Sequence, residues 1–420
     1  MEYYFQEEIL PTVKNPKLSG SAKREENAKY CGEEALKVSC LWLKSQEKEV
    51  LFISVDTLYI PKSVSLPLYA FFAKEYGLSS AQITFSATHT HSAPAIEKVF
   101  DKEAIHHEAY ILEIIQIVCN ICAKDKRNFT QGKVTFIQDS LPNNTIISRR
   151  KVGRDIRHFF LKKKMLMLPN PQQEIDRSVS ILSLQNAKGE LEVIVYNFAC
   201  HPVFNKNSQT SSDFVGKISG ILKDRLGVKS MFLQAFQGDI RPDFSTNKLL
   251  EAQGINKIKL FFNQAVFKTY TYEYFNIFSS KIAQKIIKSL DNKNAKEKIP
   301  LDYLEKEYTL CSRSQKVQHD FYIKYILLDT VLLISIPAEV TSAYALELKK
   351  AFPLQEIMFL GLADGIIGYL PFYKEIEEGG YEVNSATNYI WDSPLDTQSL
   401  NTFYSTMLKD IQVFLGSRKC

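Results

Sequence analysis

The stretch Ile83-Thr84-Phe85-Ser86-Ala87-Thr88-His89-Thr90-His91-Ser92-Ala93-Pro94 decides how the rest of this sequence is interpreted. Its apolar first half predicts a buried strand, and Pro94 stops any regular continuation. Because side chains at i and i+2 of an extended backbone point to the same side, His89 and His91 are predicted to face one site. Two imidazoles there suit a metal ion, or one ligand and a proton-transfer partner. Taken alone, the pair is equally compatible with two ordinary polar residues.

The segments before this stretch predict an α/β arrangement. Glu49–Asp56 is an apolar run typical of a buried strand, and Ser63–Gly77 has the pattern of an amphipathic helix that ends at glycine. Together with the next strand they predict a βαβ unit. Asp56 and His89 would then follow the carboxyl ends of neighbouring strands, where open α/β sheets bind their ligands.

The composition is that of a globular protein with a substantial core. The chain has 420 residues, 45% of them hydrophobic and 24% charged. The net charge of +5 is not gathered in basic runs interleaved with aromatics, so nothing favours nucleic-acid binding. We expect no membrane span, because no apolar run approaches the roughly 20 residues that one requires. The N-terminus lacks the basic and apolar regions of a signal peptide.

The seven cysteines lack the spacing of a disulfide framework, which fits a reducing compartment and predicts a cytoplasmic protein. Cys119 and Cys122 form a CxxC, but they lie in the apolar periodic segment Tyr110–Cys122. Helical spacing makes them neighbours in the core rather than a redox or zinc pair.

The remaining segments predict strands and helices without a linker or repeat between them. The first 48 residues are polar and turn-rich apart from a strand at Ala35–Leu43. Later segments are expected as follows: a helix at Glu103–Lys124, a strand at Lys133–Gln138, an irregular basic stretch at Asn143–Phe160, a hairpin of Val179–Leu184 and Glu190–Phe198, a helix at Asp213–Leu226, strands at Met231–Phe236, Tyr322–Ile336 and Glu356–Leu362, and a helix ending at Lys350. We therefore predict one α/β domain over residues 1–420, with mixed sheets flanked by helices.

Residues 246–298 differ in composition, being rich in lysine and aromatic residues, and are predicted to be helical. Leu260–Phe278 could form an apolar lid over a site. The alternative is an amphipathic helix that packs on the core with a solvated lysine face.

Polar residues next to glycine or proline follow several of the predicted strands: Asp56, His89, His91, His201, Asp239, Glu339 and Tyr369. Ligands that converge from strand ends are how catalytic metal sites are commonly built. Two imidazoles and a carboxylate form a usual zinc hydrolase set. On this pattern we assign Asp239 to the catalytic residues. Taken singly, His201 could be a loop histidine, Glu339 a carboxylate at a helix N-terminus, and Tyr369 a core residue.

Five of these segments resemble motifs of the neutral/alkaline (non-lysosomal) ceramidase family, in the family's order. They are Ser86–Ser92 (SATHTHS), Asn197–Pro202 (NFACHP), Gly238–Pro242 (GDIRP), Ile336–Thr341 (IPAEVT) and Gly361–Tyr369 (GLADGIIGY). The resemblance implies a ceramidase-like catalytic domain with a zinc ion bound by His89, His201, Glu339 and Tyr369. It also implies that His91 assists catalysis, as does Tyr369, and that Arg149 contacts the polar head of the substrate.

The sequence departs from the family pattern in ways that bear on the substrate. The family's Asn-Arg-Ser is here Ser148-Arg149-Arg150, and Arg241 stands where the family has serine. Because the sequence ends at Cys420, we expect it to lack the family's C-terminal immunoglobulin-like domain, and we expect no secretion signal. Since guanidinium binds carboxylate or phosphate, we predict a small, polar or acidic N-acyl substrate contacted by Arg149 and Arg241, rather than long-chain ceramide.

These residues predict a zinc-dependent amide hydrolase. Zinc makes water a nucleophile at neutral pH, and His91 could move the proton to the leaving amine. No Gly-x-Ser-x-Gly elbow or P-loop is present, which disfavours serine hydrolases and P-loop enzymes. A metal-dependent hydrolase of an ester or lactone, and a non-catalytic binding protein on the same scaffold, are the alternatives.

Overall fold

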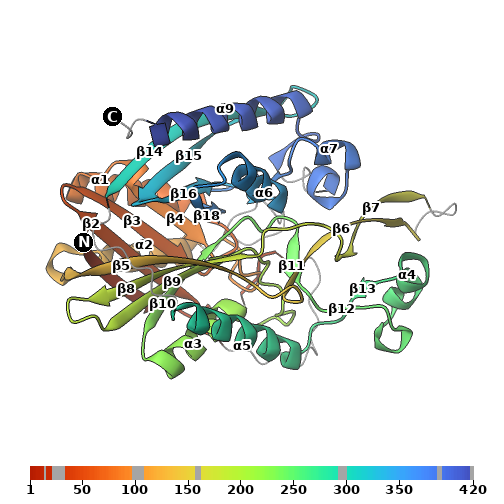
Figure 1. The fold of residues 1–420 in the computed structure, drawn as a ribbon, viewed down its shortest axis with the longest axis horizontal. Coiled ribbons are helices and arrows are strands. Elements are labelled where there is room, and N and C mark those ends of the chain that lie inside the picture. The colour runs from red at the N-terminus through yellow and green to blue at the C-terminus, as the bar shows by residue number, and fades with distance from the viewer. Residues whose placement is uncertain are drawn as a thin grey trace.

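Two β-sheets pack face to face in the computed structural model, which describes residues 1–13, 16–20, 34–96, 108–156, 162–291, 300–385 and 390–416 (Figure 1). The larger sheet has the strand order β10-β9-β8-β5-β1-β2-β3-β4, and the smaller one has the order β14-β15-β16-β18. The strands of the larger sheet are β1 (Glu2–Ile9), β2 (Lys37–Ser45), β3 (Lys48–Val55), β4 (Ile83–Ala87), β5 (Thr130–Ser140), β8 (Ser178–Asn186), β9 (Leu191–Phe198) and β10 (Lys229–Gln234). Those of the smaller sheet are β14 (Leu301–Cys311), β15 (Gln318–Leu328), β16 (Val331–Ile336) and β18 (Glu356–Gly361).

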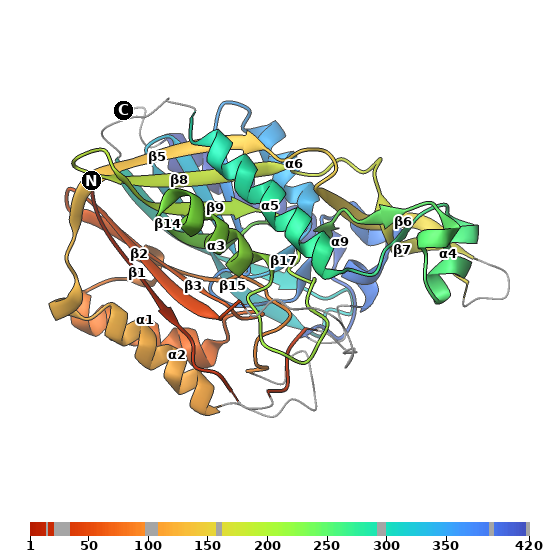
Figure 2. The same cartoon turned by 90° about the horizontal axis from the view of Figure 1, so that it is seen from below.

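Helices cover the outer face of each sheet, so the molecule has four layers (Figures 1 and 2). The helices are α1 (Lys62–Tyr76), α2 (Glu108–Ile121), α3 (Phe214–Leu226), α5 (Tyr272–Ser289), α6 (Ser342–Ala351) and α9 (Thr397–Gly416). Between the sheets lies an apolar layer that includes Leu41 and Val50 from the larger sheet and Leu333 and Met358 from the smaller one. α1 and α2 pack on β2–β4, α3 and α5 on β8–β10, and α6 and α9 on the smaller sheet. The predicted class, α/β with mixed sheets flanked by helices, is confirmed.

The predicted βαβ unit is present as β3, α1 and β4. β3 and β4 are parallel, with Val55 opposite Ala87. α1 ends at Gly77, whose backbone is left-handed with φ 70°. A residue without Cβ adopts that conformation without strain, which is why the glycine marks the end of the helix.

Three predictions about strands were wrong. The polar N-terminal segment contains β1, because a strand whose neighbours are β2 and β5 needs apolar residues only on its buried face. The irregular stretch Asn143–Phe160 contains β6 (Ile146–Arg154), although its residues 157–160 lie outside the described part. The single strand expected at Tyr322–Ile336 is a hairpin of β15 and β16, which turns at Asp329 with φ 58°. Asp tolerates that left-handed conformation, so no glycine announces the turn.

The helical prediction for 246–298 was correct only in part. The segment contains α4 (Ile255–Asn263) and α5, but also the short paired strands β12 (Ser245–Thr246) and β13 (Val266–Phe267). Phe275, Phe278 and Ile282 of α5 are buried against the larger sheet, whereas α4 lies at one end of the molecule beyond β12 and β13 (Figure 1). Residues 292–298 lie outside the described part, as do residues 103–107 of the helix predicted from Glu103.

Smaller elements surround the region where the strand ends meet. They are β6, β7 (Lys163–Asn170) and β11 (Ile240–Pro242) in one sheet, the pair β17 (Glu339–Val340) and β19 (Tyr369–Leu370), helix α7 (Glu375–Glu378) and a π-helical turn at Tyr381–Ser385. No helix in the described ranges has the length and hydropathy needed to cross a bilayer.

Candidate metal centre

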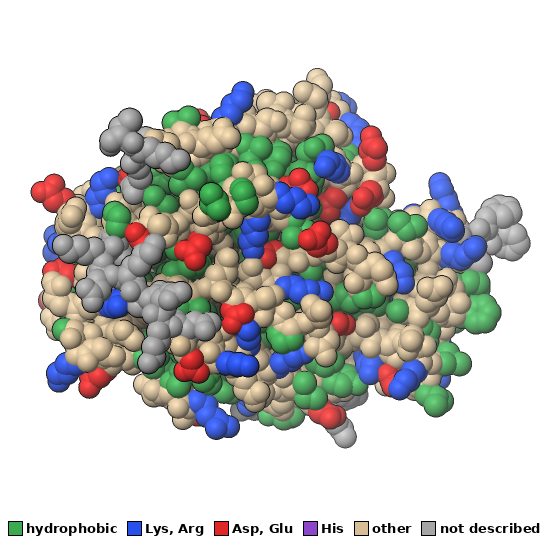
Figure 3. All heavy atoms as spheres, in the orientation of Figure 1, with side chains coloured by type: hydrophobic (Ala, Val, Ile, Leu, Met, Phe, Trp, Pro, Cys, Tyr) green, Lys and Arg blue, Asp and Glu red, His purple; other side chains and the backbone are tan. Residues whose placement is uncertain are grey.

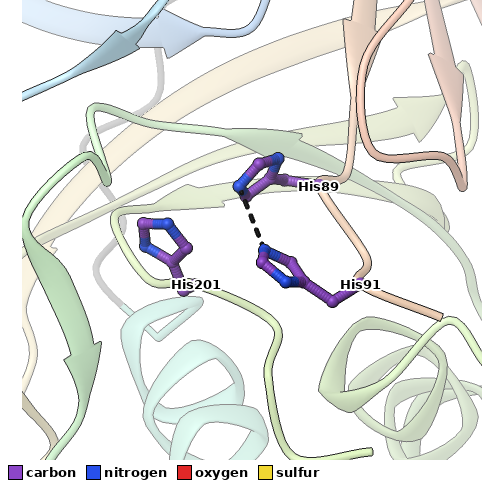
Figure 4. A group of neighbouring side chains, drawn as sticks. All are labelled: His89, His91 and His201. Atoms are coloured by element: carbon purple, nitrogen blue, oxygen red, sulfur yellow. Dashed lines mark hydrogen bonds between the residues drawn. The ribbon is translucent and has the colours of Figure 1, made fainter. Parts of the chain in front are cut away.

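Three histidines from two loops converge at the ends of β4 and β9 (Figure 4). His89 and His91 follow β4, and His201 follows β9. One ring nitrogen from each lies within 4.8 Å of the others. His89 and His201 are almost fully buried, at 1% exposure each, while His91 is partly exposed. The buried pair is therefore fixed by the fold, and His91 lies on the side that solvent can reach.

Backbone carbonyls determine which nitrogen of each buried histidine faces the centre. Nδ1 of His89 lies 2.8 Å from the carbonyl oxygen of Leu58, and Nδ1 of His201 lies 2.9 Å from that of Ile240. A carbonyl only accepts, so each Nδ1 carries a hydrogen and each Nε2 is the nitrogen that faces the centre. Carbonyls that accept from the other ring nitrogen commonly orient histidines that bind metal ions.

Glu339 supplies a carboxylate between these two Nε2 atoms. Its Oε2 lies 3.1 Å from Nε2 of His201 and 3.3 Å from Nε2 of His89. Burial and the charge of Arg149 lower the pKa of His201 to about 4, so that imidazole is neutral near pH 7. Without a proton on its Nε2, His201 has no hydrogen to share with the Glu339 carboxylate. A cation satisfies all three atoms, so the donor set fits a metal ion.

Tyr369 adds a phenol oxygen from the strand beside Glu339. β17 and β19 are parallel, with Glu339 directly opposite Tyr369. The hydroxyl lies 3.4 Å from Nε2 of His201 and accepts a hydrogen bond of 3.0 Å from Arg149 Nη2. Burial and the Glu339 carboxylate raise the pKa of this phenol well above its ordinary value, against the opposing charge of Arg149. The structure thus brings together all four residues predicted to bind zinc.

His89 and His91 share a site for a different reason from the one that the sequence suggested. β4 ends at Ala87, and His89 has φ 66°, so the two histidines are not on an extended strand. Their rings nevertheless meet edge to face with centroids 4.9 Å apart, and their Nε2 atoms are 3.4 Å apart. A left-handed turn, which histidine tolerates better than β-branched residues, produces this approach.

Arg149 lies beside the centre, but protein groups already bind it. Besides the bond to Tyr369, Nη2 donates to the carbonyl of Gly238 at 2.8 Å, and Nε donates to Glu382 at 2.8 Å. Arg150 donates to the other oxygen of Glu382 at 2.9 Å and also contacts Glu375 and Glu378. Both guanidinium groups are therefore neutralised by the protein.

Two other predicted site residues have partners away from the histidines. The Asp239 carboxylate accepts from the backbone NH of Ser342 at 2.7 Å and lies 3.2 Å from Ser148 Oγ, so it is bonded to the N-terminus of α6. The Arg241 guanidinium lies over the rings of Phe267 and Tyr270, with centroid distances of 5.0 and 5.4 Å. The carbonyl of Ile240, next to Arg241, nevertheless accepts from Nδ1 of His201 and so orients that ring.

Sequence reasoning missed Glu382 and two glycines that shape the site. Glu382 lies in the π-helical turn, and no local pattern marks a residue whose partners are 233 positions away. A Cβ on Gly20 would lie 2.7 Å from Nδ1 of His91, and one on Gly238 would lie 2.7 Å from the carbonyl oxygen of Glu339. These close approaches leave no room for a side chain.

Solved structures that are similar to this chain include two ceramidases. The neutral ceramidase from Pseudomonas aeruginosa superposes with a TM-score of 0.74 at 14% sequence identity, covering 99% of this chain and 74% of the ceramidase chain. A ceramidase complexed with C2 gives a TM-score of 0.74 at 15% identity, covering 99% and 75%. No family model and no curated protein matches the sequence. The chain therefore has a ceramidase-like fold, as the motifs predicted.

Proposed function

We propose that this protein is a zinc-dependent hydrolase that cleaves the amide bond of an N-acyl substrate. The observation that carries the proposal is the convergence of two imidazole Nε2 atoms on one carboxylate oxygen, with both Nδ1–H groups bonded to backbone carbonyls. The similarity to solved ceramidases supports the amide as the bond that is cleaved.

The residues that would hold the ion are His89, His201, Glu339 and Tyr369. Nitrogen and oxygen donors of these types suit zinc. When bound, zinc supplies Lewis-acid chemistry and a water nucleophile at neutral pH. The remaining chemistry falls to side chains of the chain itself.

His91 is the proposed general base and acid. Its Nε2 lies next to the buried ligands and its ring is partly exposed, so it can reach both the water and the substrate. It would take a proton from the attacking water and give it to nitrogen of the leaving amine, which departs as a neutral amine. Gly20 lies against the other side of the ring and would hold its orientation.

Arg149 and Tyr369 would orient and stabilise the carbonyl oxygen of the substrate. Arg149 donates to the Tyr369 hydroxyl, and that bond fixes the phenol at the edge of the centre. Positioned donors of this type stabilise charge that develops in the transition state. A direct catalytic role for Asp239 stays a prediction; its bonds to Ser342 and Ser148 support an indirect role, in which it holds the start of α6 near Glu339.

The preference for a small, polar or acidic N-acyl substrate now rests mainly on Arg241. Arg150 is balanced by three glutamates, and Arg149 is bonded to Glu382. Arg241 is stacked on aromatic rings, but its buried Nε has no hydrogen-bond partner. An acidic group on the substrate could accept from it.

The proposal is tested with zinc-loaded protein and matched substrates. We expect hydrolysis of an N-acyl amino acid, loss of turnover after chelation, and recovery with zinc. An ester and a lactone with the same acyl chain serve as controls for the bond. Turnover of the ester or lactone but not the amide would assign another reaction, and no turnover of any substrate would favour a binding protein.

A further inference from the structure

Apolar side chains are exposed on the part of the molecule that contains α4. Leu250 is 99% exposed, Phe261 82%, and Leu249, Ile255 and Ile258 between 51% and 59%. Two more come from the neighbouring strands, Val152 of β6 and Met167 of β7. We call these seven residues the α4 surface. Figure 3 shows hydrophobic side chains at this end of the molecule.

The exposed apolar residues of α4 are not part of the face that the helix packs against the protein. Leu260 and Asn263 form the buried face of α4, while Ile255, Ile258 and Phe261 repeat every three residues on the face toward solvent. The helix thus carries apolar side chains on its solvent face as well as Leu260 on its buried face. Contiguous exposed apolar groups on a folded protein mark interaction sites.

Basic residues are frequent in the segments that carry the α4 surface. The segments 151–156, 162–168 and 248–268 contain the following: Lys151, Arg154, Lys162, Lys163, Lys164, Lys248, Lys257, Lys259 and Lys268. Their acidic residues are Asp155, which pairs with Lys164, and Glu251, which pairs with Lys268 at 2.7 Å. The excess of positive charge remains after both pairs are counted.

A cavity adjoins the α4 surface. It has a volume of about 330 Å³, and its apolar walls include Leu166, Leu168 and Ile255. It opens between α4 and the β6–β7 strands, next to exposed Met167. A hydrocarbon chain at the α4 surface could therefore enter this cavity and contact its apolar walls.

We propose that the α4 surface docks on an anionic lipid bilayer. Apolar side chains flanked by lysines are the chemistry of interfacial helices, in which the apolar face enters the acyl boundary and the lysines contact anionic headgroups. β6 carries Arg149 at the metal centre and Val152 on the α4 surface. Three residues of extended strand span about 10 Å, so docking here brings the candidate centre close to the lipid.

Vesicle sedimentation with the full chain tests the proposal without relying on enzyme activity. We expect co-sedimentation with phosphatidylcholine vesicles that contain phosphatidylglycerol, at least about tenfold more than with phosphatidylcholine alone. High salt should weaken it, because screening acts on the lysine contacts. Leu250→Asp with Phe261→Asp should abolish sedimentation. Both side chains are exposed, so circular dichroism should show an unchanged fold.

Leu354→Asp provides the matched control, because Leu354 is fully exposed but precedes β18 in another part of the fold. It should sediment like the parent protein. Equal loss in this control, or no sedimentation of the parent with either vesicle, would overturn the proposal. Light scattering, which measures the mass in solution, tests whether a second copy of the chain binds this surface instead. A dimer that Phe261→Asp dissociates would show that a second copy, not lipid, binds there.

Discussion

Replacing Glu382 with glutamine should destabilise the protein by about 3 kcal/mol near pH 7. Glu382 is 2% exposed and bridges two buried arginines, at 2.8 Å from Arg149 Nε and 2.9 Å from Arg150 Nη1. Arg150 would keep Glu375 and Glu378, but Arg149 would keep only the neutral acceptors described above. Removing one partner of a buried ion pair typically costs about 3–5 kcal/mol. Glutamine retains one acceptor oxygen, so we take the lower end.

Urea unfolding followed by tryptophan fluorescence measures this change, and Glu378→Gln is its control. Glu378 contacts the same Arg150 at 3.0 Å but is 49% exposed. Exposed pairs contribute about 0–1 kcal/mol, so this variant should unfold almost like the parent. If Glu382→Gln lost no more stability than Glu378→Gln, the buried network would not have the role that its geometry implies.

The effect of Glu382→Gln should also depend on pH in a defined direction. Burial alone would raise the pKa of Glu382, but the charges of Arg149 and Arg150 outweigh it and lower that pKa below 4.5. A carboxyl with a depressed folded pKa stabilises the protein above its unfolded pKa, and this stability is lost as the pH falls through the folded pKa. The difference between parent and variant should therefore be full above about pH 5 and shrink in stronger acid.

Three further predictions concern single side chains. His91→Ala should keep its zinc but lose about 10²-fold or more in turnover; loss of metal equal to that of His89→Ala would contradict the division of roles. Burial raises the pKa of Asp56 from 3.8 to about 7, so its ionisation opposes folding as the pH rises through that window. The free energy of unfolding of Asp56→Asn, relative to that of the parent, should therefore be higher at about pH 8 than at about pH 5, by on the order of a few kcal/mol in urea unfolding. An equal difference between the two proteins at both pH values would refute this. Arg241→Ser should lower kcat/KM for an acidic N-acyl amino acid more than for ceramide, whereas efficient ceramide turnover by the parent, with no effect of the variant on either substrate, would overturn the acidic-substrate prediction.

The sequence indicated which side chains converge, because each candidate ligand follows an apolar strand in a segment that contains glycine or proline. His201 precedes Pro202, and Tyr369 follows Gly368, so local patterns mark both. These patterns predict strand ends, and parallel strands bring their ends together. That Glu339 lies between His89 and His201 depends on contacts across more than a hundred residues, which periodicity does not record.

Other features could not be predicted because local patterns gave the opposite signal. The charged residues of β1 concealed a strand with one buried face, and the left-handed backbone at His89 has no glycine to indicate it. Ile258 and Phe261 resemble core residues in sequence, yet they are exposed. Glu382 is one of many glutamates until the fold places it between two arginines.

Elemental analysis of the purified, unchelated protein tests the central claim most directly. A centre built by His89, His201, Glu339 and Tyr369 should hold about one zinc ion per chain. His201→Ala removes one of the two buried imidazoles and should lose the ion, while His91→Ala should retain it. Equal metal content in the parent protein and in His201→Ala would contradict the assignment of these residues as a zinc site.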